Sequence, residues 1–328
     1  VYPEMRTNLR KIAALSIPLL ILTGCASEPT GPLSYAELSV GLDTQCESFQ
    51  TGDAAEQITV LGDLGTQPEV TFPVPLAGTG IETAVIIEGE GGKVLGGQQV
   101  LLHFAGFNAS TGDSLQSSDF TSENYAPQDL YPGLVPDFCS ALTGVNVGSR
   151  VAVLLDPENA HGSVGVQSLG IGASDAVIFV FDILDAYLPR ANGDAQPAKA
   201  GLPTVISAPD GQPGIQIPST DAPDEFMSAV LIEGGGEPIQ IGDNVVLHYT
   251  GWTWDGEQFD SSWERQAPAT FPITADGLIE GFVMALDQAT VGSRVIAVIP
   301  PELGYGDNEQ GSIPAGSTLI FVIDVLGK

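Results

Sequence analysis

Apolar and polar residues alternate between residues 244 and 250, and this alternation predicts a β-strand. Val245, Leu247 and Tyr249 share one face of the strand, and His248 belongs to the other face. A period of two is typical of a strand that turns one face toward a core. We therefore expect Tyr249 to point inward and His248 to face solvent or to meet a backbone group.

A second pattern, further along the chain, has the spacing of a helix. Apolar residues recur three and four positions apart at Leu278, Ile279, Phe282, Val283 and Leu286. This spacing places them on one helical face. The 40 glycines and 24 prolines among 328 residues favour loop-rich β structure elsewhere. The patterns alone therefore predict an α+β fold, in which a short amphipathic helix lies among antiparallel strands.

The chain contains this strand pattern twice. Residues 85–106 align without gaps on residues 230–251, which places His103 on His248 and Phe104 on Tyr249. Two later pairs of segments also match: residues 147–155 with 291–299, and residues 177–184 with 318–325. A repeat of this size in a chain of this length predicts two domains, each with its own core.

The segments outside the two copies define the predicted domain limits. Residues 189–203 show no periodic apolar pattern and are predicted to be a linker. The first domain is then expected over residues 37–188 and the second over residues 204–328. Each copy is preceded by a Pro-rich segment that we expect to be extended.

The N-terminal residues have the pattern of an export signal. Three basic residues and an apolar run at 12–22 precede Leu22-Thr23-Gly24-Cys25, which resembles the lipobox of bacterial lipoproteins. This predicts a signal peptide over residues 1–24, lipidation at Cys25 and a tether over residues 25–36. The protein would then be exported and held by lipid on the outer face of the bacterial cell membrane. An uncleaved membrane anchor is the alternative, although the apolar run is short for one.

The charge and the remaining cysteines restrict the partners and the chemistry. A net charge of −31 excludes nucleic acid as a partner, because phosphate binding needs a basic surface. In an exported protein, Cys46 and Cys139 form either a disulfide or two buried thiols. The three histidines are scattered and no Cys-x-x-Cys occurs, so no metal site is predicted.

The C-terminal half resembles the FK506-binding-protein (FKBP) type of peptidyl-prolyl cis/trans isomerase. The resemblance rests on six motifs in order: HYTG (248–251), FDSSW (259–263), LIEGF (278–282), GYG (304–306), IP (313–314) and TLIFVIDV (318–325). It implies an antiparallel sheet half-wrapped around a short helix, present twice, with a shallow apolar pocket between sheet and helix. It also implies isomerisation of X-Pro bonds in polypeptide substrates without a cofactor, a metal or a covalent intermediate.

The resemblance assigns apolar roles to six residues of the second copy. Tyr249 and Phe259 would be pocket walls, Phe321 the far side and Phe282 the floor, with Leu278 and Ile279 closing another side. The family commonly has tryptophan at the position of Phe282, and many members carry phenylalanine at Ala269. Taken singly, Phe321 also fits an ordinary core position.

Polar roles follow from the same resemblance. The backbone amide of Ile279 and the hydroxyl of Tyr305 would donate to substrate carbonyls. Asp260 would be a buried acceptor that orients neighbouring groups, helped by Arg265 at the substrate. Ile313 would belong to a loop that overhangs the pocket.

The first copy departs from this pattern at the polar positions. Phe104 stands at the tyrosine position, Leu115-Gln116 at the Phe-Asp position and His161 at the position of Tyr305. Leu134, Val135 and Phe138 keep an apolar patch. The first domain is therefore expected to be a degenerate copy without efficient catalysis.

These observations predict an exported prolyl isomerase that assists the folding of exported proteins. A non-catalytic chaperone or peptide-binding lipoprotein using the same pocket is the alternative, and a third possibility is a scaffold in which both copies are inert spacers. A pure binder would tolerate loss of Asp260 or Tyr305, and the second copy retains both. The oligomeric state does not follow from the sequence.

Overall fold

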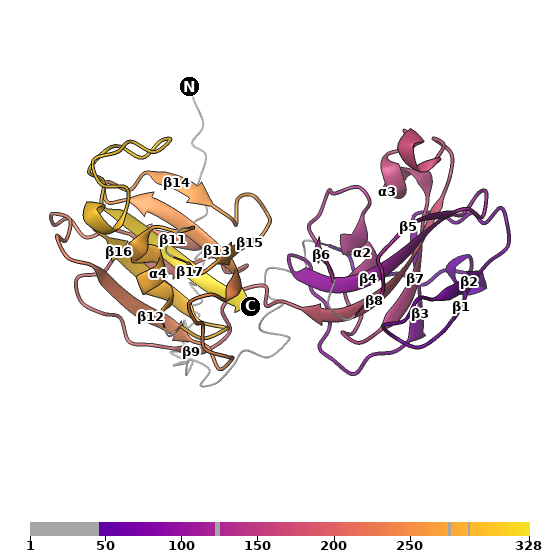
Figure 1. Cartoon of the computed structure of the whole chain (residues 1–328), viewed down its shortest axis with the longest axis horizontal. Helices are drawn as coiled ribbons and strands as arrows, with labels where there is room; N and C mark the ends of the chain where they lie inside the picture. Colours follow the sequence, from indigo (N-terminus) through magenta and orange to yellow (C-terminus); the bar gives the residue numbers. More distant parts are fainter. Residues whose placement is uncertain (1–45, 122–124, 275–276, 288) are drawn as a thin grey trace, which may run out of the picture.

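The computed structural model describes residues 46–121, 125–274, 277–287 and 289–328. Cys25 lies outside these residues, as do the whole predicted signal peptide and tether. No helix in the described part of the chain is long and apolar enough to cross a membrane. The described residues form two large antiparallel sheets, one in each lobe of Figure 1, and two separate two-stranded hairpins.

The first sheet has the strand order β3-β7-β8-β4-β5, and β6 also pairs with β4. The elements of this half are η1 (Ala55–Gln57), β1 (Thr59–Leu61), β2 (Glu69–Thr71), β3 (Ile81–Ile87), β4 (Gln99–Asn108), β5 (Ser114–Ser117), β6 (Ala126–Asp129), α2 (Phe138–Leu142), β7 (Arg150–Leu155), α3 (Pro157–His161), η2 (Gln167–Leu169) and β8 (Val177–Ala186).

The second sheet has the order β14-β13-β17-β16-β12-β9, and β15 also pairs with β13. Its half of the chain contains β9 (Asp194–Ala195), β10 (Thr204–Ser207), β11 (Pro213–Gln216), β12 (Met227–Glu233), β13 (Asn244–Thr253), β14 (Gln258–Ser261), β15 (Ala269–Pro272), α4 (Glu280–Leu286), β16 (Arg294–Ile299), η3 (Pro301–Leu303) and β17 (Leu319–Gly327).

The two sheets repeat one topology, which confirms the predicted α+β fold. In each sheet a long central strand, β4 or β13, pairs with the last strand of its copy, β8 or β17. Gly106 faces Phe179 in one sheet and Gly251 faces Phe321 in the other. This register aligns Phe179 with Phe321, so the last segments match at residues 177–184 and 319–326, one residue from the predicted alignment.

One face of each sheet packs against its short helix. On β16, Val295, Ala297 and Ile299 lie in the same buried cluster as Leu286 of α4. The alternate residues of this strand are also buried. Because successive side chains point to opposite faces, both faces of the sheet must be covered.

A two-stranded hairpin covers the second face of each sheet. In the C-terminal half, Val205 of β10 and Ile215 of β11 pack against Ile296 and Val298 of β16. The β1–β2 hairpin does the same in the first half. The segments before each copy thus contain extended strands, as predicted, and the structure adds that these strands pair with each other and close a second core.

A buried ion pair joins each hairpin to its sheet. Arg294 and Asp324 lie on neighbouring strands with side chains 4% and 1% exposed. The Arg294 guanidinium also donates to the Ser207 hydroxyl and, at 2.6 Å, to the Gly211 carbonyl of the hairpin. Arg150 and Asp182 repeat this arrangement in the first half. Each charge is thus compensated inside the protein, as a buried ion requires.

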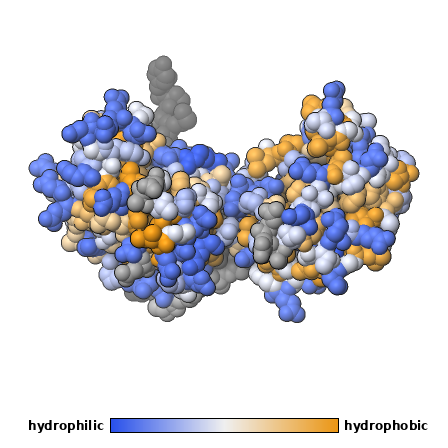
Figure 2. Space-filling view, in the orientation of Figure 1, coloured by the Kyte–Doolittle hydropathy of each residue, from blue (hydrophilic) through white to orange (hydrophobic). Residues whose placement is uncertain are grey.

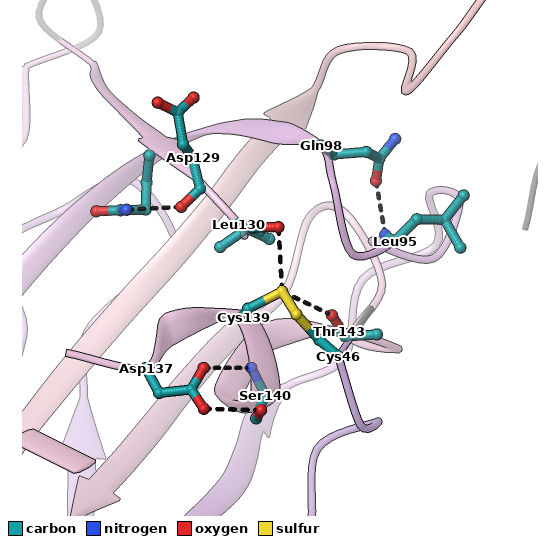
Figure 3. Close-up of a disulfide and its surroundings, with 10 residues drawn as sticks. Cys46, Leu95, Gln98, Asp129, Leu130, Asp137, Cys139, Ser140 and Thr143 are labelled. Carbon is teal, nitrogen blue, oxygen red and sulfur yellow. Dashed lines mark hydrogen bonds between the residues drawn. A yellow bond between two sulfur atoms is a disulfide. The ribbon is translucent and has the colours of Figure 1, made fainter. Parts of the chain in front are cut away.

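A disulfide joins Cys46 to Cys139 with a Cα–Cα distance of 5.8 Å (Figure 3). Cys139 belongs to α2, whose N-cap residue Asp137 accepts hydrogen bonds of 2.9 Å from the amide and the hydroxyl of Ser140. Of the two predicted states of these cysteines, the structure therefore has the bridge.

Residues 189–203 contact the second sheet along much of their length, although they were predicted to be a linker. Asp194 pairs with Glu233 of β12, and the amide of Ala191 donates to Asp324 at 2.9 Å. These contacts are long-range, so the absence of a periodic pattern did not reveal them. The exact domain limits stay predictions.

Candidate functional site

Five aromatic rings from four strands and the helix meet at one end of the second sheet. Tyr249 comes from β13, Phe259 from β14, Phe271 from β15, Phe282 from α4 and Phe321 from β17. The ring of Phe282 meets that of Phe321 edge-on at 5.1 Å, and Phe321 meets Phe259 at 5.5 Å. Tyr249 lies 5.9 to 6.3 Å from its three ring neighbours.

These rings line a cavity of about 590 Å³, which we call the cup. Its lining residues are Tyr249, Phe259, Asp260, Phe271, Gly277, Leu278, Ile279, Phe282, Tyr305, Gln310, Gly311, Ser312, Ile313 and Phe321. A concave apolar site with a few polar groups is the usual form of a ligand pocket.

A glycine in the central strand lets two of the rings approach. A Cβ atom at Gly251 would lie 2.5 Å from the ring of Phe259 and 2.9 Å from that of Phe321. Both distances are well below van der Waals contact. The absence of a side chain at Gly251 therefore permits this wall of the cup.

A polar cluster forms another part of the wall. The Tyr249 hydroxyl donates to Asp260 Oδ2 at 2.6 Å and accepts from Arg265 Nη2 at 3.0 Å. Arg265 also forms an ion pair with Asp260. Burial, together with the hydrogen bond to Asp260, raises the pKa of Tyr249 to about 12. Tyr249 therefore keeps its proton at physiological pH.

Two predictions about this cluster need correction. The Asp260 side chain is 37% exposed, so it is not the buried acceptor that we expected. Arg265 is 48% exposed and lies outside the cup lining, so it orients Tyr249 and Asp260 and does not face the cavity. Both charged groups of this ion pair are partly exposed to water, so the free-energy cost of desolvating them is smaller than it would be for a buried pair.

The remaining predicted residues reach the cup from the helix entry and from the loop after β16. Leu278 and Ile279 precede α4, with Ile279 as its N-cap residue. Tyr305 follows η3, and burial followed by the charge of Asp260 raises the pKa of Tyr305. Ile313 is 5% exposed, and reciprocal backbone hydrogen bonds of 2.9 Å with Gln310 fix its position.

The structure thus brings together all the predicted cup residues except Arg265, and it adds one aromatic residue, Phe271, and four small or polar ones: Gly277, Gln310, Gly311 and Ser312. Phe271 lies two positions after Ala269 on β15, so strand alternation gives both residues the same face. Ala269 stands where many family members carry phenylalanine, and Phe271 supplies an aromatic ring from the same face of the strand. This alternation was the signal that sequence reasoning overlooked.

His248 is buried, contrary to the expectation that it faces solvent or meets the backbone. Its Nδ1 lies 2.9 Å from the Ser262 hydroxyl, and its Nε2 lies 3.3 Å from the Tyr131 hydroxyl of the first half. Its ring stacks on Trp263 at 4.1 Å. These contacts come from distant segments, which the local pattern does not encode.

The corresponding region of the first half lacks the polar cluster. Phe138, Phe179 and Phe181 form a group of rings 5.0 to 5.5 Å apart. Phe181 pairs with Phe104, at the register position that Ile323 has opposite Tyr249. An additional ring thus fills space in this copy. His161 bonds the carbonyl of Asp175 at 2.8 Å and the amide of Gly165 at 3.1 Å, which is a structural role.

Metal binding has no structural support in the described residues, where no three His, Cys, Asp or Glu side chains are grouped to hold an ion. The cup itself is lined by aromatic rings, by Tyr249 and Tyr305 with their hydroxyl groups and by the carboxylate of Asp260.

Comparison with known proteins relates the second half to one family. A family model for FKBP-type peptidyl-prolyl cis-trans isomerase matches residues 235–326. The probable FK506-binding protein of Corynebacterium glutamicum is 37% identical over 116 residues, which cover 35% of this chain and 97% of that protein. The FK506-binding protein of Streptomyces anulatus is 36% identical over 118 residues, which cover 35% of this chain and 95% of that protein.

Solved structures are also similar to this chain. The crystal structure of FkpA from Escherichia coli shares 33% sequence identity, covers 37% of this chain and 50% of that chain, and has a TM-score of 0.30. Since the chain covers nearly the whole length of the Corynebacterium and Streptomyces proteins at more than a third identity, it belongs to the FKBP-type peptidyl-prolyl cis-trans isomerase family and is such an isomerase.

Proposed function

We propose that the isomerase activity resides in the cup of the second half and acts on proline-containing segments of exported proteins as they fold. Rotation about an X-Pro bond has a barrier of about 18–20 kcal/mol, because the amide has partial double-bond character. Uncatalysed exchange takes tens to hundreds of seconds, long enough to limit folding. A catalyst must therefore bind the twisted amide more tightly than the planar one.

The observation that supports this proposal most directly is the cup itself, a cavity walled by aromatic rings with polar groups among its lining residues. The rings of Phe259, Phe282 and Phe321 offer a dry surface to a proline ring. Removing water favours the twisted amide, since that form has less charge separation for water to solvate. No nucleophile is needed for such a rotation.

The donors then hold the substrate backbone on both sides of the bond. In this proposal the amide of Ile279 and the hydroxyl of Tyr305 donate to substrate carbonyls. Asp260 holds the Tyr249 hydroxyl at 2.6 Å and so fixes the wall against which the amide turns. Each 1.4 kcal/mol of differential stabilisation is worth about tenfold in rate.

In the same proposal the first half does not catalyse. Phe104 and Gln116 replace the Tyr249–Asp260 pair, and the three rings of Phe138, Phe179 and Phe181 pack on one another. We propose that this half serves as a structural partner of the catalytic half.

The test is a proline-limited refolding assay on the full chain. Asp260→Val and Tyr305→Phe are expected to lower kcat/KM, by about tenfold or more for Asp260→Val. Gln116→Val changes the aligned position of the first half and serves as the matched control, with activity unchanged. An intact protein that refolds its substrate no faster than the uncatalysed control would leave only peptide binding as a role for the cup.

We further propose that the protein is exported and attached to the outer face of the cell membrane through acyl chains on Cys25. The lipobox-like Leu22-Thr23-Gly24-Cys25 supports this proposal, and so does the Cys46–Cys139 disulfide, because such bridges persist in oxidising compartments. Incorporation of labelled fatty acid that is lost in Cys25→Ser is the expected result. Equal labelling of the two proteins, or none in either, would contradict it.

A further inference from the structure

The segments that build the cup carry a large excess of carboxylates. Residues 254–266, 277–287 and 301–316 together contain nine Asp or Glu residues and a single basic residue, Arg265. Arg265 is already paired with Asp260. A polypeptide that enters the cup therefore meets a negative surface without a free positive charge from these three segments.

Three exposed carboxylates lie next to lining residues, and we call Glu280, Asp307 and Glu309 the acidic rim. Glu280 directly follows Ile279, at the first position of α4. Asp307 and Glu309 lie between Tyr305 and Gln310, both of which line the cup. Figure 2 shows hydrophilic surface over this part of the lobe, where Figure 1 places the yellow loop between β16 and β17.

The loop that carries Asp307 and Glu309 is fixed by its own backbone. The amide of Gly316 donates to the carbonyl of Gly306 at 2.9 Å, and Gln310 exchanges two hydrogen bonds with Ile313. Ile313 of the same loop is buried in the cluster that contains the rings of the cup, so the backbone that carries Asp307 and Glu309 is held beside the cup.

We propose that the acidic rim gives the isomerase a preference for prolines flanked by lysine or arginine. This proposal rests on the proposed location of catalysis in the cup. One pair of unit charges about 8 Å apart in water changes an association constant about twofold. Two or three rim carboxylates acting on one substrate cation therefore give a preference of several-fold, and a substrate anion meets the opposite effect.

The general acidity of the chain does not produce the same selection. At physiological ionic strength the Debye length is about 8 Å, so distant carboxylates are screened from a bound peptide. Asp194 and Glu233 provide a matched pair for this distinction. They are exposed and pair with each other at the end of β12 opposite the loop of the rim.

The experiment measures kcat/KM for three peptides that differ only in the residue after proline, which is Lys, Gln or Glu. NMR exchange spectroscopy on the full chain reports the isomerisation rate of each peptide. We expect the order Lys, Gln, Glu, with at least about fifteenfold between Lys and Glu at 0.01 M salt, where the Debye length is about 30 Å. At 1 M salt the difference is expected to shrink to about twofold or less.

The variants then locate the effect. Asp307→Asn/Glu309→Gln is expected to reduce the ratio between the Lys and Glu peptides to about fourfold at low salt, with the rate for the Gln peptide unchanged. Asp194→Asn/Glu233→Gln is expected to leave the ratio as it is. Equal rates for the three peptides, or an equal effect of both double variants, would overturn the proposal while the activity in the cup stands. Failure to accelerate any of the peptides would instead refute the proposed function.

Discussion

Replacing Arg294 by methionine is expected to lower the free energy of unfolding of the C-terminal half by about 3–5 kcal/mol. The guanidinium donates to Asp324 at 2.5 and 2.7 Å and to the Gly211 carbonyl at 2.6 Å. Its removal takes two charge-assisted hydrogen bonds away from the Asp324 carboxylate, which is 1% exposed. Methionine keeps most of the apolar stem, so the loss reports the charge and its hydrogen bonds.

An exposed cation, Lys328, provides the matched comparison for the loss of stability in Arg294→Met. Lys328 lies 3.3 Å from Asp243 and from Glu237, in pairs whose carboxylates are 27% and 79% exposed. Such pairs contribute about 0–1 kcal/mol, because water and salt screen them. Lys328→Met also removes one positive charge, and it is expected to change stability by less than about 1 kcal/mol.

Urea unfolding followed by tryptophan fluorescence reports on the C-terminal half of the molecule. The three tryptophans of the chain are Trp252, Trp254 and Trp263, which all belong to the C-terminal half. The free energy of unfolding from this signal therefore refers to the sheet that contains Arg294.

A double variant separates the loss of the Arg294–Asp324 attraction from the cost of burying Asp324 without Arg294. Arg294→Met/Asp324→Leu is expected to recover part of the loss, since replacing a whole buried pair by apolar groups costs less than breaking it. A shift for Arg294→Met no larger than that for Lys328→Met would refute the reasoning.

Three further predictions concern the disulfide, the buried histidine and the cup. Cys139→Ser opens a bridge to Cys46 across a sequence separation of 93 and is expected to cost about 4–5 kcal/mol; unfolding followed by circular dichroism, with and without reductant, checks it, and an intact protein insensitive to reductant would contradict it. Burial lowers the pKa of His248 to about 4. In the unfolded chain the pKa of His248 is about 6.5, so between pH 6.5 and about 4 the unfolded state binds more protons than the folded state. The free energy of unfolding is therefore expected to fall by up to about 3 kcal/mol as the pH is lowered from 6.5 to about 4. His248→Gln should flatten that part of the pH profile, and identical profiles would rule the effect out. Gly251→Ala places a Cβ 2.5 Å from the Phe259 ring; displacement of the ring is expected to lower kcat/KM by roughly tenfold, and unchanged refolding catalysis would show that the wall does not need to be fixed.

The sequence by itself determined the strands, the helix and most of the cup. Val245, Leu247 and Tyr249 alternate as a strand must, and Phe282 and Leu286 lie four positions apart on one face of the helix. The helix itself begins at Glu280, after Leu278 and Ile279 of the predicted pattern. These signals are local, because side-chain direction repeats within a few residues. The family motifs then fixed the order in which the aromatic residues occur, and the structure brings them to one cavity.

Only the tertiary structure decided which distant segments meet. The hairpin at β10–β11, the hydrogen bonds of Arg294 to it and the burial of His248 against Tyr131 join residues far apart in the chain. Asp260 was expected to be buried, and it is 37% exposed in its ion pair with Arg265. Contacts of this kind are set by the packing of whole elements, since a residue's neighbours in sequence fix its face and not the partner across the core.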